Sequence, residues 1–329
     1  MHALLIATLL FMTACGDDGT SPPAAKWQLL GERLPSSLLA TWAPSLDNVW
    51  VVGGREGVGL GPTVFHYDGT AWSKLETNEV DVDLWQVFGF ADGTVFLGGS
   101  KGTILRYRDG VFTKLQTPST DIVFGLWGSS SDDVWAVGGQ TSSNAFVWRY
   151  RGTAFESVDG VPTELAQGTV WKVTGRAAND VWMSCSRGLI LHWDGNTLTK
   201  EQVGTVEESL FSMGCGTERC VAVGTNLSTG VIHENAGQGW MLVPAEGPIW
   251  RGMTPTGDDS YVVGMSGGVV RRTDTGWVPD RHLLTTKPLH AAWADDDGNL
   301  FVVGGEFDRA LTLDGVLLFK GSATLPPLP

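Results

Sequence analysis

The chain has 329 residues and a formal net charge of −14 at pH 7, which argues against nucleic-acid binding because phosphate recognition needs a basic face. Hydrophobic residues make up 42% of it, enough for a substantial core, although length alone does not choose between one large domain and two. With 44 glycines and 15 tryptophans, the composition favours short strands joined by turns over helices.

The first residues predict export. Residues 1–12 (MHALLIATLLFM) are apolar but too short to span a bilayer as a stable helix, so they indicate a signal-peptide core. They lead into residues 11–16 (FMTACG), which resemble a bacterial lipobox, although Met12 stands where leucine is usual. That resemblance implies a signal peptide over 1–15 and lipidation of Cys15. The alternative is that Cys15 is a plain thiol near a secretory cleavage site.

Residues 16–26 (GDDGTSPPAAK) are polar and contain two prolines, so they predict a flexible tether. A lipid at Cys15 would hold the protein on a membrane without any spanning helix. Gly16 stands where an aspartate would commonly retain a lipoprotein on the inner membrane. We therefore expect a bacterial cell-envelope protein, anchored in the outer membrane and facing the periplasm or the cell surface.

One short motif recurs along the rest of the chain, an aromatic or apolar residue followed three positions later by glycine. The copies are Trp50/Gly53, Phe96/Gly99, Trp135/Gly138, Val221/Gly224, Tyr261/Gly264 and Phe301/Gly304, with Trp182/Cys185 as a seventh in which cysteine replaces glycine. They lie about 42 residues apart, the period of a four-stranded propeller blade. Between them, short apolar runs alternate with Gly and Asp turns, without helical periodicity. The sequence predicts an all-β fold, a seven-bladed β-propeller of four-stranded antiparallel blades over residues 27–329.

Residues 27–35 (WQLLGERLP) resemble the fourth strand of a blade that lacks its other three strands. We predict that this N-terminal strand completes the last blade and closes the ring, which removes an exposed sheet edge. Leu317–Lys320 competes for the same place.

Several landmarks carry a resemblance to known repeat families. Gly53-Gly54, Tyr67-Asp68 and Trp72 follow the order of a kelch repeat, and the turn-rich first hairpins are similar to those of BNR and YCF48-like propellers. Residues 126–139 (LWGSSSDDVWAVGG) resemble the repeat of propeller lipoproteins of myxobacteria. The resemblance covers residues 27–320 and implies the fold, whereas propellers include binding modules, scaffolds and enzymes alike. The chain departs from it in lacking the double glycine of kelch in its fourth to sixth repeats.

The polar side chains that recur in each repeat predict structural roles. Asp132 and Asp133 lie in the turn between the first two strands of a blade, where nearly every copy has Asp or Asn, so turn chemistry is favoured over catalysis. His66, His192 and His233 occupy equivalent positions in different blades, too far apart to share a zinc ion. We expect no metal site and no cofactor.

The cysteines after Cys15 are odd in number. Cys215 and Cys220 are spaced to staple a hairpin, and an exported chain favours disulfides, so we predict this bond and an unpaired Cys185. A zinc site of three cysteines is a weaker alternative because no histidine pattern accompanies them.

The candidate binding site is a ring at the mouth of the central channel. The second residues of the predicted first strands are Leu39, Trp85, Phe124, Trp171, Phe211, Trp250 and His290, and their polar neighbours include Gln86, Lys172 and Arg251. Because first strands line the channel of a propeller, these aromatic rings are placed to stack on sugars or to contact apolar peptide side chains. The alternative is that the ring packs between blades.

No nucleophile, base and orienting group cluster outside the repeated positions, so we predict a non-enzymatic module, monomeric, that binds or scaffolds a protein or glycan. The alternative is a glycan-active hydrolase or lyase with carboxylates at the channel, for which Glu56, Glu79, Glu207 and Glu306 would have to converge. A purely structural envelope protein is a third possibility.

Overall fold

The computed structural model describes residues 25–140, 144–245, 247–256, 260–280, 284–295, 297–306 and 313–329. The predicted signal peptide, Cys15 and the tether up to residue 24 lie outside these ranges. Among the helices of the described ranges, none has the length and apolar character needed to cross a membrane.

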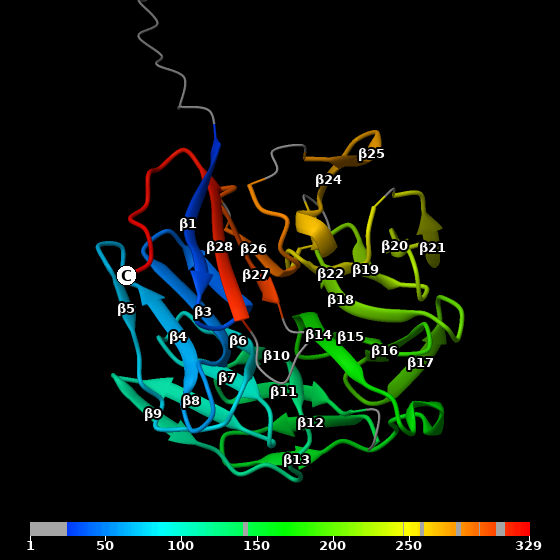
Figure 1. Cartoon of the computed structure of the whole chain (residues 1–329). Coiled ribbons are helices and arrows are strands. Elements are labelled where there is room, and N and C mark those ends of the chain that lie inside the picture. Colours follow the sequence, from blue (N-terminus) through cyan, green and yellow to red (C-terminus); the bar gives the residue numbers. More distant parts are fainter. Residues whose placement is uncertain are drawn as a thin grey trace, which may run out of the picture.

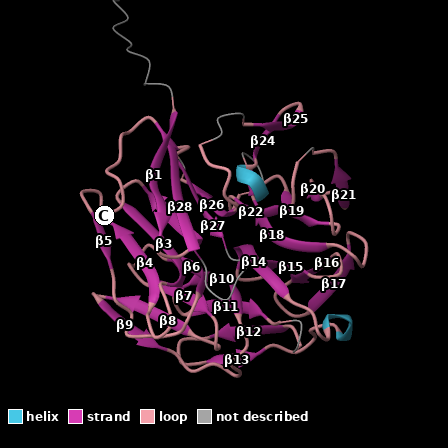
Figure 2. Ribbon diagram, in the orientation of Figure 1, coloured by secondary structure: helices cyan, strands magenta, loops and turns pink. Residues whose placement is uncertain are grey.

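The described chain forms seven four-stranded antiparallel sheets arranged around a central channel, which confirms the predicted seven-bladed propeller (Figure 1). Helical structure is limited to two single turns, η1 (Thr163–Leu165) and η2 (Met265–Gly267), in the described residues (Figure 2). Blades 1 to 3 are β2 (Leu38–Ser45), β3 (Asn48–Arg55), β4 (Pro62–Tyr67) and β5 (Trp72–Lys74); β6 (Leu84–Gly89), β7 (Val95–Gly99), β8 (Ile104–Arg108) and β9 (Val111–Lys114); and β10 (Val123–Ser130), β11 (Asp133–Gly138), β12 (Phe146–Tyr150) and β13 (Phe155–Ser157).

The remaining blades follow the same order from the channel outward, except that the last one takes its outer strand from the N-terminus. Blades 4 to 7 are β14 (Val170–Ala177), β15 (Asp180–Cys185), β16 (Leu189–Trp193) and β17 (Leu198–Gln202); β18 (Ser209–Cys215), β19 (Cys220–Thr225), β20 (Gly230–Asn235) and β21 (Trp240–Val243); β22 (Trp250–Met253), β23 (Tyr261–Gly264), β24 (Val269–Thr273) and β25 (Gly276–Pro279); and β26 (Leu289–Ala294), β27 (Leu300–Glu306), β28 (Leu313–Gly321) and β1 (Lys26–Leu34).

The ring closes as predicted, by the N-terminal strand. β1 pairs antiparallel with β28, with Trp27 opposite Lys320, so residues 317–320 are part of the third strand and do not compete for the fourth place. The C-terminal tail then crosses the seam to blade 1, where the Leu328 amide donates to the Leu30 carbonyl at 2.7 Å and Trp72 Nε1 donates to the Pro326 carbonyl at 3.0 Å. Both ends of the propeller chain therefore hold the closure.

The hydrophobic core is divided among the seams between neighbouring blades. In the described chain, seven clusters of buried residues each combine strands of two adjacent blades. Trp135, for example, is fully buried and packs with Met183 of the next blade. Because each blade buries its faces only against its neighbours, the closed ring is what completes the core.

The repeated glycine is required by a close backbone approach. A Cβ built on each glycine of this slot would overlap the carbonyl oxygen of the residue that precedes the inner strand of the same blade or, in blade 5, begins it. In blade 4 the slot holds Cys185, which is fully buried. The glycines and the residues whose oxygens they face are Gly53 and Ser37, Gly99 and Asp83, Gly138 and Ile122, Gly224 and Ser209, Gly264 and Ile249, and Gly304 and Pro288.

The recurrent turn acids have structural partners. Asp133 accepts hydrogen bonds from Arg149 Nε at 2.6 Å and Ser129 Oγ at 2.7 Å. Burial alone would raise the pKa of Asp133, but the hydrogen bonds from Arg149 and Ser129 hold it below its usual range. Asp133 therefore anchors its hairpin to the third strand of the blade.

The repeat histidines are also structural, with one difference in register. His66 stacks on Trp50 at 4.4 Å and His192 stacks on Trp182 at 3.9 Å between ring centroids. Their equivalent in blade 5 is Glu234, which pairs with Val221, so the predicted equivalence of His233 is wrong by one residue. His233 is instead buried against Glu208, with Nε2 and Oε2 2.7 Å apart. No group of three or more His, Cys, Asp or Glu in the described ranges is placed to hold a metal ion.

Cys215 and Cys220 form a disulfide across the first hairpin of blade 5, and Cys185 is a free, buried thiol whose pKa is raised by burial. We expect the double variant Cys215→Ala, Cys220→Ala to lose about 2 kcal/mol of unfolding free energy, because the bond restricts a short loop of the unfolded chain. Urea unfolding of both proteins at pH 7 measures the difference. An unchanged midpoint would show that the bond is absent or without effect on stability.

Candidate functional site

The channel-facing side chains share a backbone cause, a β-bulge in every inner strand. In blade 2, Leu84 pairs with Gly99 and Gln86 pairs with Gly98, which leaves Trp85 without a cross-strand partner. A bulge redirects its extra residue and increases the local twist. The same register break occurs in all seven inner strands, at Leu39, Trp85, Phe124, Trp171, Phe211, Arg251 and His290.

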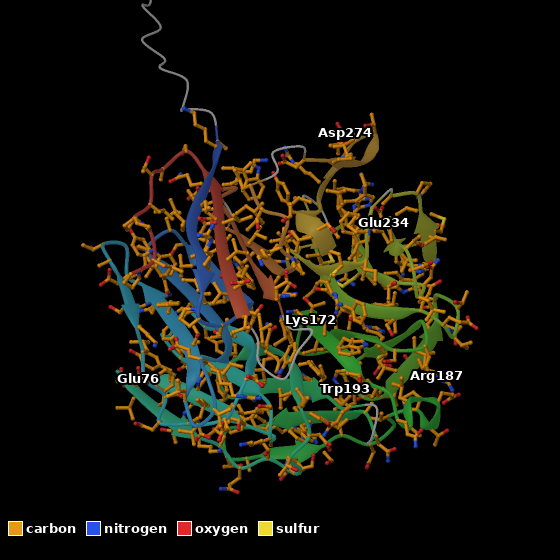
Figure 3. The ribbon with its side chains drawn as sticks, in the orientation of Figure 1. Glu76, Lys172, Arg187, Trp193, Glu234 and Asp274 are labelled. Atoms are coloured by element: carbon orange, nitrogen blue, oxygen red, sulfur yellow. A yellow bond between two sulfur atoms is a disulfide. The ribbon has the colours of Figure 1, made fainter. Side chains whose placement is uncertain are left out.

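These seven side chains line one cavity of about 620 Å³, at the end of the channel where the inner strands begin. Lys172, labelled near the centre of the ring of blades in Figure 3, belongs to the wall. The other lining residues are Gln86, Ser212, Met253 and Ala291.

The predicted placement of Trp250 is wrong by one residue. Trp250 pairs with Gly264, is 1% exposed and packs in the seam between blades 5 and 6. Arg251 takes the bulge position in its place and lines the cavity. The remaining predicted residues, from Trp85 to His290 with Gln86 and Lys172, all line the cavity.

Four aromatic bulge residues form a continuous arc. Ring centroids lie 5.2 Å apart for Trp85 and Phe124, 4.9 Å for Phe124 and Trp171, and 5.2 Å for Trp171 and Phe211. The Arg251 guanidinium continues the arc 5.2 Å from the Phe211 centroid. Trp171 Nε1 is buried and has no hydrogen-bond partner among the described residues, so it remains a donor for a ligand.

A lysine crosses the channel at the bottom of the cavity. Lys172 Nζ, from blade 4, donates to Gln86 Oε1 of blade 2 at 2.7 Å, and Gln86 Nε2 donates to the Val87 carbonyl at 3.1 Å. Burial lowers the pKa of Lys172 to about 8, so the amine is still mostly protonated at pH 7. Within the described chain this ammonium makes no ion pair.

His290 is a neutral member of the wall. Burial lowers its pKa to about 3, with a further contribution from the Arg251 charge, and Nε2 donates to the Gly305 carbonyl at 2.7 Å. The Lys172 and Arg251 side chains are then the charged groups of the lining, which includes no Asp or Glu among its described residues.

The carboxylates that the glycan-active alternative requires do not converge on this cavity. Glu56 pairs with Lys74 at 2.8 Å and Glu79 pairs with Lys114 at 2.6 Å. Glu306 lies 3.5 Å from Lys287, and Glu207 is exposed. None of the four lines the channel cavity, so the geometry does not favour a carboxylate pair at this place.

A second cavity lies on the other side of the lysine bridge. It has a volume of about 410 Å³ and an apolar lining that includes Trp127, Met213 and Trp293. Gln86 and Lys172 line both cavities, so their hydrogen bond divides the channel. Sequence reasoning missed this division because Gln86 and Lys172 are two blades apart and nothing in the repeat indicates which side chains meet across the axis.

No protein-family model matches the chain, and none of the curated proteins matches its sequence. Several solved structures share its architecture. "YCF48 bound to D1 peptide" superposes with a TM-score of 0.64 at 16% identity over 91% of this chain and 99% of that one. The chain is a propeller-repeat protein. The WD40 propeller domain of Doa1 gives 0.64 at 12% identity over 89% and 96% of the two chains. The extracellular domain of the putative one component system BT4673 from B. thetaiotaomicron superposes with a TM-score of 0.63 at 15% identity. The match covers 91% of this chain and 40% of that one.

At these identities the likeness extends to the fold of the propeller alone. Propellers host many functions, so the ligand has to be argued from the residues of this channel.

Proposed function

We propose that this propeller is a non-enzymatic binding module and that its channel-mouth cavity receives part of a protein or glycan ligand. The observation that carries the proposal is the bulge ring, since seven inner strands each turn one residue toward the same cavity. Six of the seven side chains stay partly exposed although the ring sits over a tightly packed core. Partly exposed aromatic rings offer large contact area at a low entropic cost.

The proposed setting is the bacterial envelope, with the propeller held by a lipid at Cys15. The sequence of residues 1–26 supports this part of the proposal. Among the similar structures, one is YCF48 bound to D1 peptide and another is the extracellular domain of BT4673, which is compatible with binding by a propeller of this kind.

The test is a binding screen of the full-length chain against peptide and glycan arrays, followed by affinity measurements on single variants. Trp85→Ala and Trp171→Ala are each expected to weaken binding about 30-fold, the effect of removing a central aromatic contact. Trp240→Ala is the matched control, because Trp240 lies on the outermost strand of blade 5 and does not line the cavity.

Binding that survives both cavity variants, with their folds retained, would place the ligand elsewhere on the propeller. Turnover of a bound glycan would contradict the non-enzymatic proposal and restore the hydrolase or lyase alternative.

A further inference from the structure

We propose that the cavity selects an apolar group that carries a carboxylate, because its described lining presents two cations, four aromatic rings and no acid. The inference rests on the proposed function, since it names the chemistry of the group that enters the cavity. The positive charge of the cavity lining also contrasts with the net charge of the whole chain, which is −14. In such an acidic protein, a cavity wall whose buried lysine makes no ion pair within the described chain is a specific feature and not a reflection of composition.

Lys172 is the first contact for the carboxylate. Its ammonium donates to the neutral Gln86 amide oxygen at 2.7 Å and has no ion pair in the described chain. A lysine ammonium has three donors, so it can bind an anion while keeping the bond to Gln86. Burying an unpaired charge costs free energy, and a bound carboxylate would relieve that cost.

Two further groups on the same wall favour an anion. The Arg251 guanidinium lies beside the Phe211 ring, and guanidinium groups match carboxylates with paired hydrogen bonds. Trp171 Nε1 is a buried donor without a partner among the described residues. His290 adds no charge of its own because burial keeps it neutral at pH 7.

The aromatic arc favours an apolar body over a sugar. Neighbouring rings of the arc contact one another at interplanar angles of 71°, 51° and 78°. Each ring is therefore partly covered by the next one. Stacking on a sugar needs an open ring face, whereas ring edges carry partial positive charge and suit an anionic group with an apolar body. Such a group is supplied either by a free organic acid or by the C-terminal residue of a peptide.

The test compares acids with their neutral amides by calorimetry on the full-length protein at pH 7. The probes are indole-3-propionate and indole-3-propionamide for the free acid, and Gly-Gly-Phe with a free or an amidated C-terminus for the peptide. We expect the acid of at least one pair to bind at least about tenfold tighter than its amide, the effect of a charge-assisted hydrogen bond. The pair with the larger preference identifies the source.

Variants then connect the preference to Lys172. Lys172→Met is expected to remove most of the acid-over-amide ratio, Lys172→Arg to keep it, and the control Lys26→Met, which removes an exposed charge on β1, to leave it unchanged. If Lys172→Met fails to fold, the test depends on the acid-over-amide ratio in the wild type and in Lys172→Arg, which is expected to be similar in the two proteins.

Equal binding of acid and amide overturns the carboxylate inference and leaves the binding module intact. So does failure of all four probes when an array ligand still binds in a Trp85-dependent way. If none of the four probes binds and no ligand on the peptide and glycan arrays binds, both the carboxylate inference and the proposed binding function are overturned.

Discussion

Replacing Gly224 with alanine is expected to lower the free energy of unfolding by about 4 kcal/mol, near the upper end for single substitutions. The added Cβ would overlap the Ser209 carbonyl oxygen and lie 2.9 Å from Leu210 Cα. Both are backbone atoms of the inner strand, so relief requires moving that strand, its bulge and the wall of the cavity. Urea unfolding at pH 7 measures the loss.

Cys185→Ala is the matched control for this prediction. It changes the same slot in blade 4, where a Cβ is already accommodated, so the expected loss is about 1–2 kcal/mol for the removed sulfur. A loss for Gly224→Ala no larger than that for Cys185→Ala would show that the glycine slot tolerates a side chain, and the explanation of the repeat would be wrong.

The same close approach explains why the fold could be predicted from the sequence. In six of the seven blades a Cβ opposite the start of the inner strand would overlap its backbone, so glycine recurs with the blade period and can be found without any structure. Ring closure was predictable for a related reason, since residues 27–35 match a fourth strand and lack the three that should precede it.

Positions within a strand were less predictable because a bulge has no sequence signature of its own. In blade 6, Ile249 and Trp250 have the same apolar-aromatic pattern as Leu84 and Trp85 in blade 2. The bulge nevertheless lies at Arg251, the residue after the aromatic one, whereas in blade 2 it lies at the aromatic residue itself. A shift of one residue turns a side chain from the channel to the seam. Trp250 is therefore core, and the cation that replaces it in the ring changes the chemistry of the cavity.

The stability of the protein in acid is expected to depend on His290. Its pKa is lowered from 6.5 to about 3 by burial, with Arg251 adding to the effect, so the folded state disfavours the charged imidazole. Above about pH 6.5 the ring is neutral in both states and costs nothing. Below that pH the unfolded chain takes up a proton that the folded chain does not, and the free energy of unfolding falls until about pH 3.

His290→Gln removes this titration, and the glutamine amide can still donate to the Gly305 carbonyl. Between pH 7 and pH 4 the wild type is expected to lose about 3 kcal/mol more unfolding free energy than the variant, since each pH unit below 6.5 contributes about 1.4 kcal/mol. Urea unfolding of both proteins at several pH values gives the difference, in which the carboxylate titrations common to both cancel. Parallel stability curves would show that His290 is protonated in the folded state as readily as in the unfolded chain. The cavity would then carry a third positive charge in acid, and its preference for carboxylates over amides should increase as the pH falls from 7 to 5. With His290 neutral, that preference arises from Lys172 and Arg251 and stays constant over the same range for an acid that remains ionised.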